Sequence, residues 1–265
     1  MKLSDIQNCT KMTMIKRAST FVFTILAIII ITGSSTFAQK APEFSNDLMM
    51  DNKTYLYLIA EKLEYRSVSG INPLMWEVQG YVGKDLNKFW FKSRGEALTT
   101  DREAEMEFQG LYSRAIGPYF DIQVGIRYDL AYEGGGNKSR GFAVIGLQGM
   151  APYFFHVDGG MFISEKGDIS ASVEAEYDLL FTQRLIGQPV FETSVAVQEV
   201  PKWGVGSGFN NIGLGFRLRY EFAREFAPYI GINWERKLGE TADIARAEGG
   251  HVSNLSMVGG VRMWF

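Results

Sequence analysis

The chain has 265 residues, of which 46% are hydrophobic, 14% aromatic and 22% charged, and its formal net charge is −3. Disordered chains are poor in aromatic residues, so this composition excludes intrinsic disorder. A nucleic-acid partner, which requires a basic surface, is not expected at this charge. The single cysteine, Cys9, excludes a disulfide scaffold.

Residues 1–38 have the features of a cleaved secretory signal. Four basic residues precede an apolar run from Phe21 to Ile31, and small residues lead up to Ala38. The apolar run has about 11 residues, whereas a membrane-anchoring helix, the alternative, needs roughly 20. We therefore expect a signal peptide over residues 1–38, a short periplasmic segment over 39–54 and a single domain over 55–265.

Residues 212–222 show the pattern that dominates this domain. Apolar side chains stand at every second position from Ile212 to Phe222, with glycine, arginine and glutamate between them. In a helix these apolar side chains would scatter around the circumference, whereas in a strand they share one face. The segment is therefore predicted to be a β-strand.

The same period of two recurs along the whole domain. It predicts twelve strands of about 9–12 residues and no amphipathic helix of convincing length. The predicted strands cover 55–66, 74–82, 86–96, 104–112, 120–128, 140–148, 155–163, 171–179, 185–198, 212–222, 227–236 and 252–265.

The connections are predicted to alternate between short turns and longer loops. The short turns are expected at 114–119, 151–153, 181–184 and 223–226, and the longer loops at 97–102, 132–139, 165–168, 199–209 and 237–251. This alternation is typical of outer-membrane barrels, whose periplasmic turns are short and whose outer loops are longer.

Strand length and polar-face charges favour a transmembrane barrel over a soluble lipocalin-like barrel. Strands of about ten residues cross a membrane when tilted, and closely spaced charges such as Arg217 and Arg219 need a wet lumen. Aromatic residues gather near the strand ends, as in the aromatic girdles of membrane proteins. Hydrocarbon offers no hydrogen-bond partner to the backbone, so the predicted fold is all-β: a closed antiparallel transmembrane β-barrel in outer-membrane lipid.

No catalytic motif is present, so we expect a protein that is not an enzyme. An outer-membrane lipase-like or lipid A-modifying barrel would need a Ser/His pair, and only His156 and His251 are available. The glycines at 134–136 precede no helix and are interpreted as an outer loop rather than a phosphate site.

Some residues of the polar faces could contact a metal ion. Glu103, Glu105 and Glu107 fall on one side of a strand, about 6.5–7 Å apart at alternate positions, and form either a cation-attracting lumen wall or a wall paired with facing Arg and Lys. His156 shares the polar face with Asp158, and imidazole is a common copper or zinc ligand, although a lone lumen histidine is also consistent with simple solvation. Thioethers prefer Cu(I), and the adjacent Met49 and Met50 precede the first strand.

Four stretches of the domain resemble the copper resistance protein B family of outer-membrane proteins. They are EAEYDLLFTQRLIGQP at 174–189, GFRLRYEFAREFAPYIGINWERKLG at 215–239, LYSRAIGPYFDIQVGIR within 109–127, and GETADIARAEG at 239–249 followed by the strand ending at Phe265. A terminal aromatic residue on an amphipathic strand is also similar to the signal read by the outer-membrane insertion machinery. The resemblance covers roughly residues 55–265.

The resemblance implies copper homeostasis at the outer membrane of a Gram-negative cell, commonly with a periplasmic multicopper oxidase as partner. It implies copper ions as the transported or weakly bound species. Family members often carry a Met/His-rich region before the barrel, where this chain has only residues 39–54. The alternatives are a non-catalytic docking barrel for a periplasmic copper-handling partner and a general small-solute channel.

Overall fold

The computed structural model describes residues 53–67, 72–98, 103–133 and 136–265. The predicted signal peptide, residues 39–52 of the predicted periplasmic segment and the Met49–Met50 pair lie outside the described residues. Those predictions therefore stay as they were.

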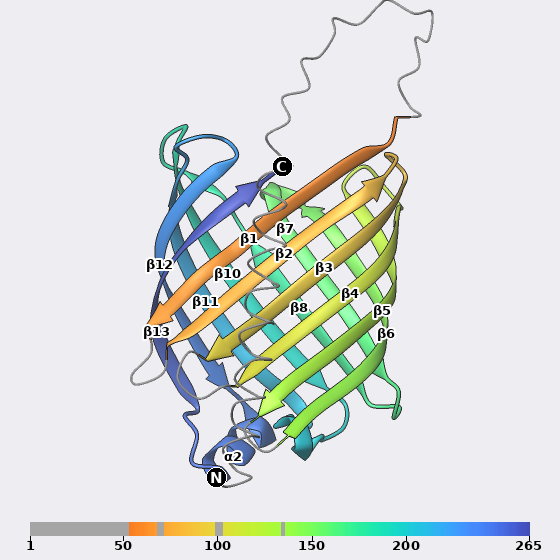
Figure 1. Ribbon diagram of the computed structural model, residues 1–265, viewed down its shortest axis with the longest axis vertical. Coiled ribbons are helices and arrows are strands. Elements are labelled where there is room, and N and C mark those ends of the chain that lie inside the picture. The colour runs from red at the N-terminus through yellow and green to blue at the C-terminus, as the bar shows by residue number, and fades with distance from the viewer. Residues whose placement is uncertain (1–52, 68–71, 99–102, 134–135) are drawn as a thin grey trace, which may run out of the picture. The chain divides into compact units, whose positions relative to one another are not determined.

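The described residues form one antiparallel sheet that closes on itself (Figure 1). Twelve strands cross the barrel: β1 (Tyr55–Ser67), β2 (Pro73–Gly83), β3 (Asn87–Leu98), β4 (Ala104–Ala115), β5 (Phe120–Glu133), β6 (Gly136–Ala151), β7 (Phe155–Ser164), β8 (Ile169–Glu176), β10 (Leu185–Ala196), β11 (Gly208–Tyr220), β12 (Phe226–Lys237) and β13 (Ser253–Trp264). The two-residue β9 (Leu179–Leu180) pairs with β10 inside a turn. The predicted closed twelve-stranded barrel is confirmed.

The barrel closes where the last strand pairs with the first. Strands β1 and β13 are antiparallel, and Leu58 and Phe265 exchange backbone hydrogen bonds of 3.2 and 2.8 Å. Because the number of crossing strands is even, β1 begins and β13 ends on the same side, which we call the chain-end side. The opposite side carries α2 (Gly239–Ala247) and is called the helix side (Figure 1).

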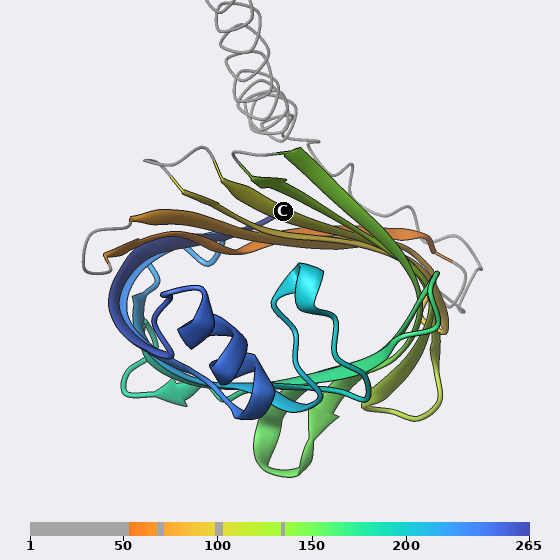
Figure 2. The same cartoon turned by 90° about the horizontal axis from the view of Figure 1, so that it is seen from below.

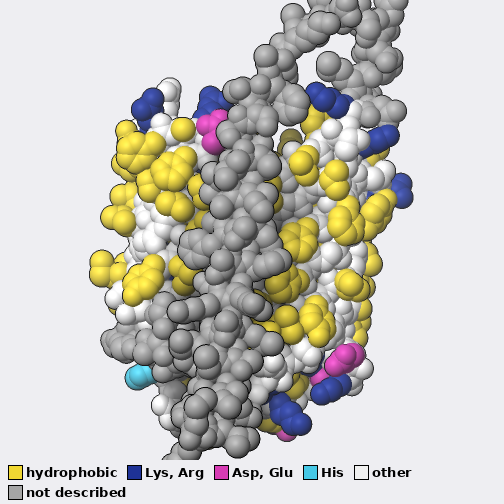
Figure 3. Space-filling view, viewed as in Figure 1, with side chains coloured by type: hydrophobic (Ala, Val, Ile, Leu, Met, Phe, Trp, Pro, Cys, Tyr) yellow, Lys and Arg dark blue, Asp and Glu magenta, His cyan; other side chains and the backbone are white. Residues whose placement is uncertain are grey.

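The outer surface of the barrel is apolar. Alternate residues of the strands point outward and remain exposed, among them Phe89 at 56%, Ile126 at 70%, Ile230 at 68% and Met257 at 72%. Yellow side chains cover the visible wall in Figure 3, with charged side chains gathered towards the two ends. A soluble barrel would bury its apolar face inward, so this arrangement is that of a membrane-spanning barrel.

Exposed aromatic residues mark both ends of this wall. On the chain-end side they include Tyr119 at 68% and Phe222 at 65%, and on the helix side Tyr65 at 47% and Phe209 at 63%. The aromatic residues near strand ends therefore occupy the two levels expected of interfacial girdles.

A β-bulge explains why the alternation is weak in β1. The pairing register of β1 shifts between Ala60 and Leu63 against β13 and between Ala60 and Lys62 against β2, so one residue is inserted into the strand. Before the bulge Ile59 is buried, and after it Lys62 and Glu64 are the buried residues. The bulge thereby turns Lys62 and Glu64 into the lumen, which a strict period of two would not place there.

One of the predicted longer loops is wrong. Strands β5 and β6 extend to Glu133 and Gly136, which pair with each other, so no loop spans 132–139. The connection predicted at 165–168 does join β7 to β8. It is a tight turn, because the Ser164 hydroxyl accepts hydrogen bonds from the backbone N–H groups of Lys166 and Asp168 and Gly167 adopts a φ of 89°. In the 132–139 segment, strand pairing extends further than its glycine-rich and polar composition indicates.

The sequence predicts no amphipathic helix of convincing length, and the short helix α2 was not anticipated. Helix α2 forms within the predicted loop 237–251 and buries Thr241, Ala242 and Ala245. Glu240 stands in its first turn and Arg246 in its last, which suits the helix dipole. At nine residues the helix is too short to be stable alone, so its packing against the barrel decides its formation. Two 3-10 turns complete the described elements, η1 (Pro152–Phe154) and η2 (Pro201–Trp203).

Among the described helices, none has the length and apolar character to cross a membrane.

Candidate functional site: the barrel lumen

Lys62 is the centre of a charge cluster in the lumen. The residue is 7% exposed, and it reaches from β1 to carboxylates on β2, β8 and β10. Its Nζ atom lies 2.6 Å from Glu174, 2.9 Å from Glu77, 3.6 Å from Glu192 and 3.9 Å from Glu176. A buried ammonium is tolerated in such a place because several carboxylates compensate it.

Arg94 on β3 completes this cluster. One guanidinium nitrogen lies 2.7 Å from Glu77 and 2.6 Å from Glu174. Residues 94 and 174 belong to strands that are not neighbours in the sheet, so this ion pair crosses the lumen, as the Lys62–Glu174 pair does. We call Lys62, Arg94, Glu77, Glu174, Glu176 and Glu192 the lumen lattice.

A second buried ion pair stabilises the wall beside the lattice. Glu64, fully buried, accepts hydrogen bonds from Arg217 at 3.2 Å, from Arg66 at 2.8 Å and from the Tyr229 hydroxyl at 3.1 Å. These partners come from β1, β11 and β12, so the pair links strands on both sides of the closing seam.

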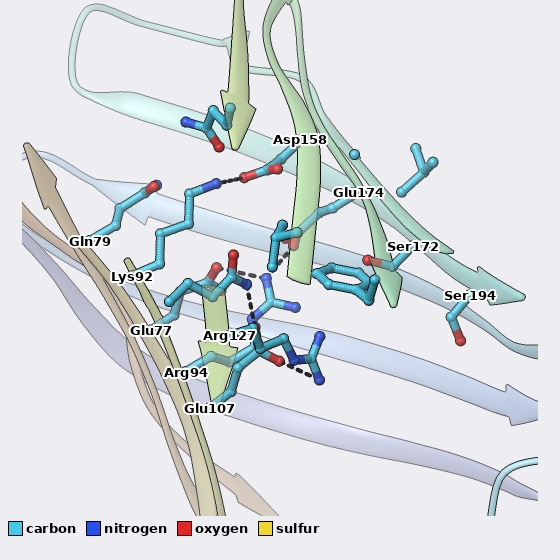
Figure 4. Close-up of a pocket in the computed structure, with 18 of the residues that line it drawn as sticks. Glu77, Gln79, Lys92, Arg94, Glu107, Arg127, Asp158, Ser172, Glu174 and Ser194 are labelled. Atoms are coloured by element: carbon cyan, nitrogen blue, oxygen red, sulfur yellow. Dashed lines mark hydrogen bonds and ion pairs between the residues drawn. The ribbon is translucent and has the colours of Figure 1, made fainter. Parts of the chain in front are cut away.

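A cavity of about 210 Å³, the chain-end chamber, lies beside the lattice (Figure 4). Gln79, Gln109, Gln123, Ser172 and Ser194 are among its polar lining residues. Its charged lining residues are Lys92, Arg94, Arg127, Glu77, Glu107, Asp158, Glu174 and Glu192.

A second cavity of about 380 Å³, the capped chamber, lies towards the helix side. It shares Arg94, Glu107 and Arg127 with the chain-end chamber, so these side chains stand between the two. Its own lining is more apolar and includes Met75, Leu130, Phe142, Val200, Trp203 and Val205.

The β10–β11 loop covers the capped chamber, and helix α2 lies against this loop. Figure 2 shows both within the outline of the barrel mouth. The Thr241 hydroxyl accepts the Gly206 N–H at 2.8 Å, and the Glu240 carboxylate accepts the Ser207 N–H at 2.9 Å and hydroxyl at 2.7 Å. These bonds join loop and helix into one lid, and they hold the pKa of the Glu240 carboxyl below its usual value.

Two of the predicted metal-contacting carboxylates are paired with cations. Glu107 lies 2.8 Å from Arg127, and Asp158 lies 2.5 Å from Lys92, across the lumen from it. The wall of carboxylates facing arginine and lysine, one of the two predicted alternatives, is thus present at Glu107. Both residues line the chain-end chamber.

The other predicted metal contacts are spread along the barrel. Glu103 immediately precedes β4, and Glu105 is the second residue of that strand, so both lie at the helix side of the barrel. His156 is exposed at the start of β7, on the chain-end side. His251 follows α2, so the two histidines lie at opposite ends of the barrel. Within the described ranges, no three His, Cys, Asp or Glu side chains converge as a metal site would require.

Several lumen residues were missed by the sequence reasoning. Lys62 was hidden by the bulge, and Arg94, Gln79 and Glu192 were not singled out, although they stand on polar faces of predicted strands. These residues come close only because strands far apart in the sequence face one another across the lumen. Residue spacing along a single strand does not reveal that contact.

Comparison with known proteins identifies the family of this chain. Residues 54–265 match the family described as copper resistance protein B precursor (CopB). The chain belongs to the copper resistance protein B family. The matched region begins one residue before β1 and ends at Phe265, so the similarity to copper resistance protein B covers the whole barrel.

Two curated relatives carry the same family name. Copper resistance protein B of Escherichia coli is 37% identical over 211 residues, which is 80% of this chain and 69% of that protein. The copper resistance protein B homolog of Pseudomonas syringae pv. tomato is 36% identical over 215 residues, covering 81% and 71%. Among solved structures, the NanC porin is 13% identical with a TM-score of 0.49 over 79% of this chain and 99% of that one.

The family and the barrel together indicate an outer-membrane protein. The apolar wall suits lipid contact, and the family name connects the protein to copper. A non-enzymatic role agrees with both.

Proposed function

We propose that this barrel lets copper ions pass across the outer membrane of a Gram-negative cell through its lumen. The proposal depends on one observation: the residues that match the family are the same residues that form the barrel. Copper resistance protein B similarity spans 54–265, and within that range the lumen holds two chambers that both have carboxylates in their lining. The predicted contacts at Glu103, Glu105, Glu107, His156 and Asp158 would act weakly and in succession, because a conducted ion must leave as readily as it binds.

The test uses a copper-sensitive Gram-negative host that lacks its own outer-membrane component. Expression of the full chain should raise copper tolerance and change cell-associated copper. Ser172 lines both chambers, so Ser172→Trp should fill the passage and return tolerance to the level of the empty vector. The matched control is Ser67→Trp, because Ser67 is exposed at the end of β1.

A docking role predicts a different outcome. A barrel that only holds a periplasmic multicopper oxidase at the membrane would keep its effect when the lumen is filled. Full tolerance with Ser172→Trp, in cells where the variant is inserted and heat-modifiable on gels, would therefore exclude passage. A general small-solute channel would show equal uptake of neutral sugars and copper, with both blocked by the same variant.

A further inference from the structure

The two ends of the barrel carry charges of opposite sign. Among the described residues, the exposed charged side chains of the helix side are seven carboxylates and four cations. On the chain-end side the exposed carboxylates of the described residues are Asp85 and Glu225, and cations outnumber them. Lys and Arg side chains accordingly stand along the chain-end edge of the wall in Figure 3. These chain-end cations are Lys53, Lys84, Arg114, Arg184 and Arg224.

Three of these cations are not neutralised by the protein. The guanidinium groups of Arg114, Arg184 and Arg224 make no ion pair or hydrogen bond with any residue that the structure describes. Cations of the lumen differ in this respect, since Lys92, for example, is paired with Asp158. We call the turns and strand ends that carry these three arginines the basic rim.

Arg114 stands on the lipid-facing side of the wall. Leu111 and Ser113 of β4 are buried, at 1% and 0% exposure. Tyr112 is 52% exposed, so Arg114, two residues further along the strand, shares its outward face. The partner of Arg114 on β5 is Ile122, an exposed residue of the same apolar wall. A guanidinium at this edge lies at headgroup depth, because a long basic side chain there extends towards the polar layer.

Exposed apolar side chains accompany the arginines of the basic rim. In the turn after Arg114, Ile116 is 61% and Tyr119 is 68% exposed. Phe181, in the turn that carries Arg184, is 59% exposed. These turns continue the apolar outer wall, so their apolar side chains enter the membrane interface beside the cations. Apolar anchors next to cationic side chains are the pattern of a surface that binds an anionic membrane.

The turns of Arg184 and Arg224 adjoin. The backbone N–H of Glu221, which begins the turn that carries Arg224, donates to the Arg184 carbonyl oxygen at 2.8 Å. Two guanidinium groups therefore stand on neighbouring turns, above Tyr220 and Phe222, whose rings pack edge to face at 4.9 Å.

Phosphate is the anion that suits these groups. A guanidinium binds phosphate oxygens through two parallel N–H groups, and it is more weakly hydrated than an ammonium. Because Arg114 projects from the lipid-facing wall, the phosphate within its reach is that of a phospholipid. The chain-end connections are short turns, as the periplasmic connections of outer-membrane barrels are, so the leaflet concerned is the periplasmic one.

We propose that the basic rim binds the headgroups of anionic phospholipids in the periplasmic leaflet, with Arg114 and Arg184 as the principal contacts. This surface lies on the outside of the barrel and does not depend on the passage of copper through the lumen.

The test measures which lipids the barrel retains. The full chain is refolded into vesicles of phosphatidylcholine in which phosphatidylglycerol is the minor component, and it is then extracted in mild detergent. Mass spectrometry of the retained lipids should show phosphatidylglycerol enriched over its share in the vesicles. The enrichment should fall at high salt, because exposed charges are screened. Retention of the two lipids in the vesicle ratio would overturn the proposal and favour an acidic protein as the partner of the rim.

Two variants locate the contact. Arg114→Gln and Arg184→Gln each remove one cation near the membrane surface, and each should lower the enrichment by up to about fivefold. Arg114→Lys keeps the charge and should retain most of the enrichment. Native heat-modifiability on gels checks that each variant is folded.

The matched control is Arg246→Gln. Arg246 is an exposed arginine of α2 that is paired with Asp243, and α2 lies within the outline of the barrel mouth, away from the outer wall (Figure 2). This control should leave the enrichment at its native value. An equal fall in the control, or no fall in either rim variant, would mean that the basic rim is not the lipid site.

Discussion

The two chambers of the lumen differ in how they are built. The chain-end chamber is bounded by charged residues whose partners stand across the lumen, such as Lys92 with Asp158 and Arg94 with Glu174. The capped chamber also has charged strand residues in its lining, such as Asp129 and Arg140, but it is more apolar and includes Trp203 and Val205 of the loop that covers it. Ion pairs between strands bound the first chamber, and a lid outside the strands is added in the second.

Because of this difference, the strands determine how rigid the lumen is, whereas the lid determines access to the capped chamber. Strand residues that form the chain-end chamber are tied into a continuous hydrogen-bonded sheet, so changing them alters the barrel. The Thr241 hydroxyl donates a hydrogen bond to Asn210 of β11, which joins the lid to the barrel, while the bonds of Thr241 and Glu240 with Gly206 and Ser207 join loop and helix to each other. The lid can therefore change while the barrel remains.

The largest effect is expected from Lys62→Met. The change leaves the carboxylates of Glu77, Glu174, Glu176 and Glu192 with Arg94 as the remaining cation of the lattice. Removing one partner of a buried ion pair costs about 3–5 kcal/mol, and we expect a loss of unfolding free energy of this size. Urea unfolding in lipid vesicles measures it.

Lys62→Arg is the control for this change, because it keeps the positive charge. A Lys62→Met barrel as stable as the native protein would mean that the lattice does not hold the chain-end chamber, and the comparison between the chambers would lose its basis.

A smaller effect is expected from Gly206→Val. A Cβ atom at position 206 would lie 2.4 Å from the Thr241 nitrogen and 2.5 Å from the Glu240 Cβ, so the loop must separate from α2. Overpacking costs about 1–3 kcal/mol. We expect faster trypsin cleavage at Lys202 and higher ion conductance in planar bilayers, with the barrel intact on gels.

The matched control is Gly117→Val in a chain-end turn, where an added Cβ meets no atom within 4 Å. Should Gly206→Val leave both cleavage and conductance at native levels, the β10–β11 loop would not limit access to the capped chamber.

The smallest effect is a pH dependence of the lid. Ser207 hydrogen bonds lower the pKa of Glu240, so the ionised carboxylate favours the closed lid. This contribution is present above the usual carboxyl pKa and is lost as the pH falls through the lowered value. Hydrogen exchange of residues 198–207, corrected for its intrinsic rate, should therefore increase at acidic pH.

Glu240→Gln should remove this pH step, and Ser207→Ala should shift it towards higher pH. If Glu240→Gln keeps a pH step of native size, another group causes the step, and the Glu240–Ser207 hydrogen bond does not control the lid.

Most of the fold was predictable from the sequence, for a local reason. In segments such as Ile212–Phe222, lipid on one side and water on the other impose a period of two, and that period needs no knowledge of distant residues. The site was less predictable. Glu107 and Asp158 were identified as lumen carboxylates, but their cationic partners, Arg127 and Lys92, were not.

The amino-acid sequence by itself determined the strands, their apolar outer face and the family, because each depends on neighbours along the chain. Tertiary structure decided the rest. The bulge after Ala60 turned Lys62 inward, closure of the sheet brought it to Glu174 across 112 positions of sequence, and packing against β11 allowed the short helix α2 to form. Those features arise where distant strands face one another, and no pattern within a single strand contains them.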